Sequence, residues 1–243
     1  MRNIWTIARR ELYSYFSSPI AYVTMAAFLA VEGLLFWLFL FYAQLYSQSM
    51  EMSHILGSGW IFFILMLYSA VVTMRLLAEE QRSGTIELVL TAPVRDWELV
   101  TGKYLASLIL FLAMLIVSAY QPLVLVRFGD PDLGATASGY LGLFLVGAAL
   151  LAIGTLTSTF TRNQVVAAIL SIGIGVALWL VEFAGTGSPG TTSGEILTQV
   201  ALRTHLVDFF DGLIDTRHVV YYLSLVATNL FVATQVLQAR RWR

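Results

Sequence analysis

The sequence predicts an all-α integral membrane protein with six transmembrane helices. Of its 243 residues, 58% are apolar and 12% are charged, whereas a soluble domain is about 45–50% apolar and about 25% charged. So little charge leaves too little polar surface to cover a soluble globule, and disorder requires the opposite composition. The net charge of −1 provides no basic field for nucleic acid. The absence of cysteine removes disulfides, thiol catalysis and cysteine metal sites.

Six apolar stretches of about 20 residues each are long enough to cross the hydrocarbon core as helices. They are 20–45, 58–77, 103–126, 139–160, 165–184 and 219–238. The first is too long for a typical signal-peptide core and is interpreted as a retained span. We therefore expect one transmembrane domain over 1–243. Its parts are an interfacial helix in 1–18, five spans in 20–184, an outer loop in 185–218, and the sixth span with a basic tail in 219–243.

The orientation follows from the basic residues. Eleven of the fourteen Lys and Arg residues lie on one side of the six spans, and only Arg127, Arg203 and Arg217 lie in the opposite loops. Loops rich in Lys and Arg stay in the cytoplasm. Because the number of spans is even, we expect a multi-pass protein of the cell's inner (plasma) membrane with both termini in the cytoplasm.

Segment 2–18, before the first span, has the pattern of an amphipathic helix in the membrane interface. Its arginines lie away from an apolar face formed by Ile4, Ala8, Leu12, Tyr15 and Phe16. Apolar burial and anionic lipids bind such a helix to the membrane. Pro19 is expected to end it before the first span.

The loop 75–101 between spans two and three predicts a short cytoplasmic helix of about two turns. Gly84 is a suitable N-cap, Glu87 suits the positive end of the helix, and Pro93 ends it. Between them Ile86, Val89 and Leu90 form an apolar edge. Such an edge in a charged loop packs on the protein's own spans or contacts a partner.

The loop 185–218 predicts an amphipathic helix on the outer membrane surface before span six. Residues 186–194 are typical of a flexible linker. Beyond it, apolar residues recur at helical spacing, and three carboxylates mark a polar face: Leu202, Leu206, Phe209, Phe210, Leu213 and Ile214, with Asp208, Asp211 and Asp215.

Two polar residues within the spans are candidates for a translocation path. A carboxylate such as Glu32, near the middle of span one, is costly in the membrane and usually faces the bundle interior. It is interpreted as a path or gating group, as a protonated carboxyl bonded to another span, or as a carboxylate that lies nearer the interface. Gln121 precedes Pro122 in span three, where a proline bends the helix as a fixed kink or a hinge.

Other residues carry structural interpretations. Spans four and five contain glycines that permit close helix approach: Gly142, Gly147, Gly154, Gly173 and Gly175. Glu182 is expected at the membrane interface. The three histidines, His54, His205 and His218, all fall outside the spans, match no metal-binding spacing, and are expected on the surface.

These features resemble the permease subunits of type-2 ABC exporters, which have an interfacial helix, six spans and a coupling helix between spans two and three. The coupling loop carries the family pattern in Glu79-Glu80-Gln81-Arg82-Ser83-Gly84-Thr85-Ile86-Glu87, followed by Pro93, with Lys103 entering span three. Two further segments, 8–19 and 210–219, are similar to the gliding-motility-type branch. The resemblance covers nearly the whole chain.

The resemblance implies that two permeases pair, as a homodimer or a heterodimer, in contact with membrane lipids. Each permease docks on a cytoplasmic ATP-binding subunit through Gly84, Thr85, Ile86, Glu87, Val89, Leu90 and Pro93. ATP and magnesium would be bound by that partner and no cofactor by this chain, which contains no G-x-x-x-x-G-K-[ST] run. The chain would then be a transport subunit without enzymatic activity of its own. Two alternatives remain: a membrane scaffold or mechanotransmission subunit acting on an extracytoplasmic partner, and an ion-coupled secondary carrier.

Overall fold

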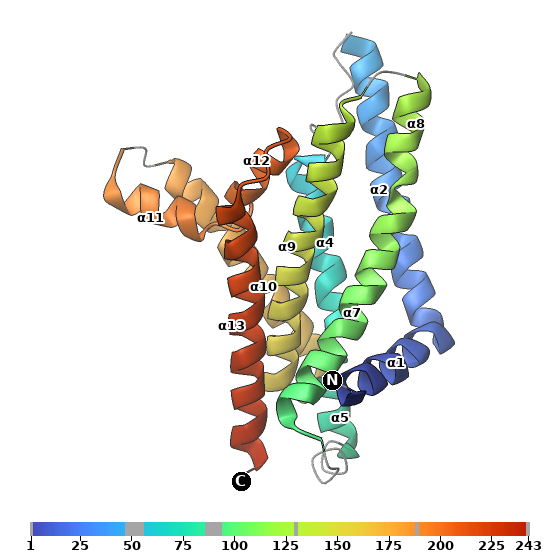
Figure 1. The fold of residues 1–243 in the computed structure, drawn as a ribbon, viewed down its shortest axis with the longest axis vertical. Coiled ribbons are helices and arrows are strands. Elements are labelled where there is room, and N and C mark those ends of the chain that lie inside the picture. Colours follow the sequence, from blue (N-terminus) through green and yellow to red (C-terminus); the bar gives the residue numbers. More distant parts are fainter. Residues whose placement is uncertain (1, 47–55, 86–93, 129–130, 188–189, 242–243) are drawn as a thin grey trace.

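The computed structural model describes residues 2–46, 56–85, 94–128, 131–187 and 190–241, and these form a bundle of long helices (Figure 1). Six helical segments are long and apolar enough to cross a membrane, which confirms the six predicted spans. They are Ala21–Tyr42, Gly59–Ser83, Asp96–Arg127, Leu133–Phe160, Gln164–Thr186 and Thr216–Ala239. Both termini lie at the same end of the bundle (Figure 1).

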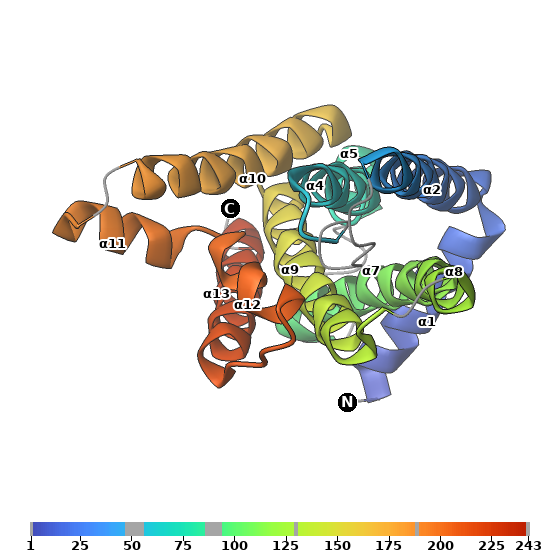
Figure 2. The same ribbon diagram turned by 90° about the horizontal axis from the view of Figure 1, so that it is seen from above.

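The helices pack in two layers, which are clearest from above (Figure 2). One layer contains α2 (Pro19–Tyr46), α4 (Gly59–Thr73) and α10 (Gln164–Thr186). The other contains α7 (Asp96–Ser118), α8 (Tyr120–Phe128), α9 (Leu133–Phe160) and α13 (Thr216–Arg241). Helix α9 contacts α4, α7, α10 and α13, so it is the central helix of the fold.

Small residues let α9 approach its neighbours closely. A Cβ atom at Gly147 would lie 2.2 Å from the ring of Phe111, and one at Gly154 would lie 2.0 Å from the Thr73 hydroxyl oxygen. Gly142 and Gly175 contact Phe209 and Met66 in the same way. These four glycines therefore act in packing as predicted. Gly173 takes no part, because a Cβ atom there would have open space within 4 Å among the described residues.

Replacing Gly147 by alanine should destabilise the bundle. The added methyl group would overlap the buried Phe111 ring, and such overpacking costs about 1–3 kcal/mol. Gly173→Ala is the matched control, because it adds the same methyl group to open space and should leave stability unchanged or slightly higher. Thermal unfolding of the two variants in detergent makes the comparison. Equal unfolding temperatures would show that the Phe111 contact does not limit packing.

The interfacial helix is present as α1 (Arg2–Ser17), and Pro19 begins α2 after a break at Ser18. Proline is tolerated there because the first turn of a helix needs no N–H partner. Much of the predicted apolar face packs on the protein itself, since Ala8 and Tyr15 are buried. At Gly102 in α7, a Cβ would lie 2.9 Å from the side chain of Ile7. The exposed aromatic residues of α1 are Trp5 and Tyr13, which lie outside the predicted face, and Phe16, which belongs to it.

Span three is interrupted where the proline was expected to act. Helix α7 ends at Ser118, and α8 begins at Tyr120. Pro122 has no N–H to donate to the Ser118 carbonyl four residues earlier. The Tyr140 hydroxyl of α9 donates to that carbonyl instead, at 3.0 Å. This contact supports the fixed kink, with the freed carbonyl satisfied by a neighbouring span.

The outer segment differs from the prediction. The last three residues of the expected linker, 192–194, begin a helix, α11 (Thr192–Val200), whose first turn is capped by the Thr191 hydroxyl accepting from Gly194 N–H at 3.1 Å. The expected amphipathic helix is reduced to a 3-10 turn, η1 (Thr204–Leu206), and one α-helical turn, α12 (Val207–Phe210). Leu202, Leu206, Phe209 and Phe210 are buried, the last three beside α9 at Gly139 and Gly142, while Leu213 and Ile214 are exposed. Three of these six apolar residues therefore cover span four.

Candidate coupling site

The segment that leads into the predicted coupling loop is a short helix, α5 (Ala78–Ser83), at the end of the bundle that holds both termini (Figure 1). Its start is fixed by Ser158 at the end of α9, whose hydroxyl oxygen accepts from Leu77 N–H and Ala78 N–H, each at 3.0 Å. The Gln81 amide donates to the carbonyls of Ser158 and Thr159 at 3.3 and 3.2 Å. Span four thus holds both ends of this helix.

A buried lysine joins α5 to two other helices. The Lys103 ammonium in α7 lies 2.9 Å from the Glu80 carboxylate in α5 and 3.2 Å from the Glu11 carboxylate in α1. Only 2% of the Lys103 side chain is exposed. A buried cation is stable when it is paired and hydrogen-bonded. This ion triad, Glu11–Lys103–Glu80, therefore links the interfacial helix α1, the helix α5, which we call the coupling segment, and span three.

A second contact holds α1 on span two. The Tyr15 hydroxyl donates to the Val72 carbonyl at 3.0 Å, and the Arg75 guanidinium lies 4.6 Å from the centre of the Tyr15 ring. Burial, followed by the charge of Glu11, raises the pKa of Tyr15 well above its ordinary value, so the phenol stays protonated and keeps donating. A cation over an aromatic ring adds about 0.5–1 kcal/mol at exposed sites and more where the ring is buried, as Tyr15 is.

Further polar contacts tie the same region to spans three and five. The Asn3 amide donates to Glu98 at 3.1 Å, and Glu98 also accepts from Arg95 N–H at 3.0 Å, which caps the start of α7. The Gln164 amide at the start of α10 donates to the Glu79 carboxylate. The coupling segment and its immediate neighbours are thus connected to α1, α7, α9 and α10.

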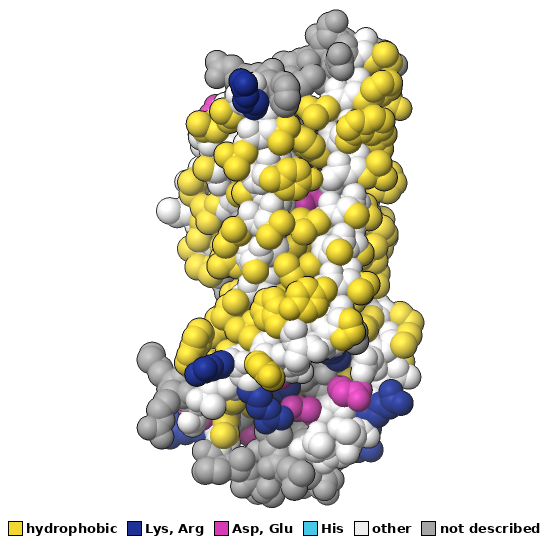
Figure 3. Space-filling view, turned by 90° about the vertical axis from the view of Figure 1, so that its right-hand side faces the viewer, with side chains coloured by type: hydrophobic (Ala, Val, Ile, Leu, Met, Phe, Trp, Pro, Cys, Tyr) yellow, Lys and Arg dark blue, Asp and Glu magenta, His cyan; other side chains and the backbone are white. Residues whose placement is uncertain are grey.

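The charges at this end surround a cavity of about 230 Å³. Figure 3 shows Lys, Arg, Asp and Glu side chains gathered at this end, below a largely apolar face. The lining contains three basic and three acidic side chains: Arg10, Arg75 and Lys103 with Glu11, Glu79 and Glu80. This balance favours charge pairing within the protein over capture of a free anion or cation.

The predicted coupling residues are only partly placed. Gly84 ends α5 with φ of 74°, a left-handed conformation that suits glycine, so it closes one helix in addition to any role in starting another. The Thr85 hydroxyl lies 2.8 Å from the Ser83 hydroxyl. Ile86, Glu87, Val89, Leu90 and Pro93 lie outside the described residues. Their docking role stays a prediction.

Glu32 and Gln121 are both buried within the membrane-spanning bundle, at 2% and 0% exposed. Among the described residues, neither amide atom of Gln121 has a hydrogen-bond partner. The Oε2 atom of Glu32 has none either. Helices α2 and α8 approach each other here, because a Cβ at Gly33 would lie 2.9 Å from the Tyr120 hydroxyl. The face in Figure 3 shows a small patch of acidic atoms within its apolar band. Buried polar groups without partners are costly, so the two side chains remain candidates for a translocation path.

At the opposite end, two of the histidines meet, contrary to the surface role predicted for them. His205 is only 8% exposed, and its Nδ1 lies 2.7 Å from Nδ1 of His218. His205 Nε2 lies 2.9 Å from the Gln199 carbonyl, and His218 Nε2 lies 2.7 Å from Asp208. A carbonyl can only accept, so His205 carries its proton on Nε2 and accepts through Nδ1 when neutral. His54 lies outside the described residues.

Stability should fall as the pH falls below the ordinary histidine value. Burial, aided by the charge of His218, lowers the pKa of His205. The unfolded chain takes up a proton near pH 6.5 while the folded chain resists, so folding is favoured above about pH 6.5 and weakened below it. Thermal unfolding in detergent between pH 7.5 and 5 measures the slope. His205→Asn should flatten it, and an unchanged slope in that variant would assign the dependence to other groups.

Glu182, which was expected at the membrane interface, also forms polar contacts. Its carboxylate pairs with Arg203 at 2.6 Å, and the same guanidinium donates to the Gly57 carbonyl at 2.9 Å. The pair connects the end of span five with the outer segment and the start of span two.

Six spans, a helix before the first span and a polar network at the base of the loop between spans two and three define a multi-pass α-helical membrane protein. The chain belongs to the ABC-2 family of transporter proteins, whose family model matches residues 5–234. It is therefore a multi-pass membrane permease subunit, as the sequence resemblance indicated. A search among curated proteins finds no match.

Proposed function

We propose that this chain is the permease subunit of an exporter driven by a separate cytoplasmic ATP-binding subunit. Membership of the ABC-2 family supports the proposal, together with the absence of a phosphate-binding G-x-x-x-x-G-K-[ST] run in the sequence. ATP and magnesium are bound by the partner, and this chain binds no cofactor. The observation that carries the coupling role is the ion triad, which joins the coupling segment to two other helices.

The triad gives the ATP-binding subunit a route to the spans. A push on the loop after Ser83 acts on α5, which is bonded to the ends of α9 and α10 and paired through Lys103 with α7 and α1. Buried charges in low dielectric resist separation, so the connected helices move together. The loop would thus transmit motion to spans three, four and five.

The loop end of the bundle is placed in the cytoplasm in this proposal, with both termini. The distribution of basic residues supports that orientation. A second permease, identical or related, completes the path, and the segments 8–19 and 210–219 favour the gliding-motility-type branch. A cytoplasmic ATP-binding subunit can bind the loop only if the loop lies in the cytoplasm. Binding of that subunit through the loop therefore also tests the orientation.

Purification of the full chain from its native membranes in mild detergent tests the function. We expect an ATP-binding subunit to co-purify and to hydrolyse ATP in the complex. A homogeneous chain without such a subunit would contradict the proposal. If the complex hydrolyses ATP but moves no amphiphile or polymer across vesicles while it binds an extracytoplasmic protein, the scaffold or mechanotransmission role replaces export. Flux that follows an ion gradient without ATP would indicate a secondary carrier.

Glu32 and Gln121 form part of the translocation path in this proposal. Their unpartnered atoms would gain partners from a polar substrate or water that passes between α2 and α8. Glu32→Gln retains size and hydrogen bonding, so it should fold normally and change the rate of ATP-coupled transport. Glu195→Gln, which makes the same change at an exposed position of α11, is the control. Equal transport rates in Glu32→Gln and the parent would remove Glu32 from the path.

A further inference from the structure

Two histidines connect the outer segment to span six, at the end of the bundle opposite both termini (Figure 1). His205 lies in η1, between α11 and α12, and His218 lies in the first turn of α13. Their Nδ1 atoms are 2.7 Å apart. Beyond them, His205 Nε2 reaches the Gln199 carbonyl at 2.9 Å, and His218 Nε2 reaches Asp208 at 2.7 Å. Three hydrogen bonds in a row thus join α11, η1, α13 and α12.

Two neutral histidine rings cannot make all three of these bonds. A carbonyl and an ionised carboxylate only accept, so both Nε2 atoms must carry protons. A neutral imidazole carries one proton, which would leave two bare Nδ1 atoms facing each other at 2.7 Å. A third proton between the Nδ1 atoms removes this repulsion and completes the row. The two rings then hold one excess proton, which the Asp208 carboxylate balances.

A proton fits the space between the rings better than a metal ion does. Two nitrogens that bind one tetrahedral zinc ion, at about 2.0–2.1 Å each, lie about 3.3 Å apart. The two Nδ1 atoms are 2.7 Å apart, which is a hydrogen-bond distance. Among the described residues, no group of three or more His, Cys, Asp or Glu side chains could hold a metal ion.

Aromatic rings and one carboxylate surround the pair. The rings of Tyr221 and Tyr222 in α13 lie 4.0 and 6.4 Å from the His205 ring. Asp208 is the one charged side chain that bonds to either histidine among the described residues, so a second excess proton would lack a counter-charge. The other titratable or charged side chains on the elements packed around the pair do not bond to it. They are Tyr140 of α9, Glu195 of α11, Arg203 before η1, Asp211 and Asp215 after α12, and Arg217 of α13.

We infer that one proton shared by His205 and His218 latches the outer segment to span six, and that uptake of a second proton opens this latch. With four protons on the two rings, each Nδ1 carries a hydrogen, and two N–H groups would face each other at 2.7 Å. The rings must then separate, which moves η1 away from α13. Loss of the shared proton has less effect, because His218 can keep its Nδ1–H while water replaces its bond to the half-exposed Asp208.

An open latch loosens the part of the outer segment that covers span four. Phe209, which follows His205 in the chain, lies against Gly142 of α9. Bonds that do not titrate in this pH range keep the segment attached, such as the Tyr222 hydroxyl donating to the Leu202 carbonyl at 2.7 Å, so the movement is local. Burial lowers the pKa of His205, in agreement with a closed latch that resists the second proton. The latch needs no ATP-binding subunit and is therefore independent of the proposed function.

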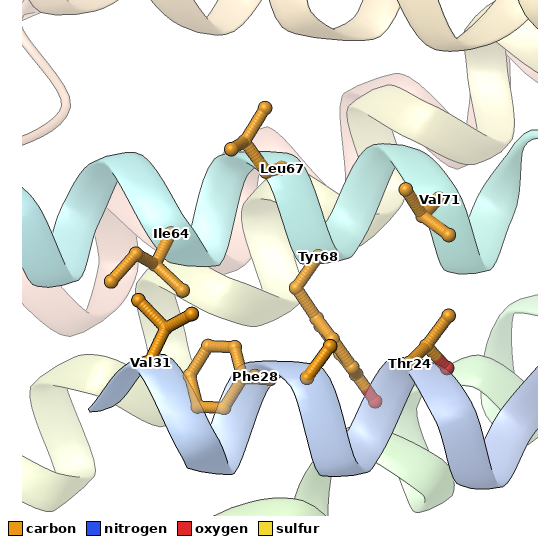
Figure 4. Close-up of a pocket in the computed structure, with 8 residues that line it drawn as sticks. Thr24, Phe28, Val31, Ile64, Leu67, Tyr68 and Val71 are labelled. Atoms are coloured by element: carbon orange, nitrogen blue, oxygen red, sulfur yellow. The ribbon is translucent and has the colours of Figure 1, made fainter. Parts of the chain in front are cut away.

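Amide hydrogen exchange of the full chain in detergent, followed by mass spectrometry at pH 7.5 and pH 5, tests the latch. The reporting amides are those of Leu206, Asp211 and Leu213, which donate to carbonyls within the same segment. An open ring takes up a proton near pH 6.5, so these amides should exchange about 30-fold faster at pH 5, after correction for the intrinsic rate. Amides around Phe28 and Tyr68, where α2 packs on α4 (Figure 4), should stay protected at both pH values.

His205→Gln should remove the dependence on pH, because a glutamine amide can donate to the Gln199 carbonyl but does not titrate. His54→Gln makes the same change at the third histidine of the chain and is the matched control, which should keep the 30-fold acceleration. Equal acceleration in His205→Gln and in the parent would overturn the latch. So would equal acceleration around Phe28 and Tyr68, because the whole bundle would then be opening.

Nitrogen-15 spectra of the His54→Gln chain, labelled at its two remaining histidines, count the protons without changing the latch. At pH 6.5 we expect three of the four ring nitrogens of His205 and His218 to be protonated. Two protonated nitrogens would overturn the shared proton. Four protonated nitrogens, with the reporting amides still protected, would show that a second proton does not open the latch.

Discussion

Replacing Lys103 by methionine should destabilise the permease by about 3 kcal/mol, the lower end of the cost of breaking a buried ion pair. Methionine fills similar space but leaves the carboxylates of Glu11 and Glu80 facing each other without their shared cation. The penalty arises from these remaining charges, more than from the attraction that is lost. Chemical unfolding in detergent measures the change.

Two controls separate the effect of breaking the ion triad from the effect of removing any basic residue. Arg82→Met removes an exposed cation from α5 and should change stability by less than about 0.5 kcal/mol. The triple variant Lys103→Met, Glu11→Gln and Glu80→Gln removes all three charges and should recover most of the stability, because neutral replacement of a buried ionic group is often tolerated. Equal stability of Lys103→Met and Arg82→Met would show that the triad is not a structural link.

The spans are predictable because membrane insertion depends on a local property, a run of about 20 apolar residues. The kink at Pro122 is predictable for the same reason, since proline acts on its own helix. Helix α5 is not predictable in this way, because its residues, Ala78–Ser83, are mostly polar and have the composition of a loop. The helix is held by Ser158, which lies about 80 residues away in the sequence and gives no local signal.

The polar clusters are likewise not predictable from the local sequence. In the sequence Lys103 marks the cytoplasmic side and fits the family pattern at the entry of span three, but nothing in its neighbourhood indicates Glu11, which is 92 residues away. His205 and His218 are 13 residues apart, and a turn containing Gly212 with φ of 83° brings their rings together. Helix α11 has a usable local signal in Thr191 at the N-cap and Glu195 in the first turn, which the glycine-rich composition obscures.

Replacing Val89 by aspartate should abolish co-purification of the ATP-binding subunit, while the permease still inserts and folds. Ile86, Val89 and Leu90 form the predicted apolar edge of the coupling loop, in the manner of an amphipathic helix that docks in a groove. Truncation of a central apolar contact costs about 2 kcal/mol or more, which weakens binding about 30-fold. A carboxylate at that position adds the cost of burying an unpaired charge.

The control places the same change at the opposite end of the bundle. Ile196→Asp puts a carboxylate on an exposed position of α11 and should leave co-purification and ATP hydrolysis unchanged. Gly84→Pro should give an intermediate loss, because proline cannot adopt the φ of 74° that ends α5 and directs the loop. If Val89→Asp retained both partner binding and ATP-coupled activity, the loop would not be the coupling element. The triad beneath it would then serve stability alone, because no motion would enter the spans through α5.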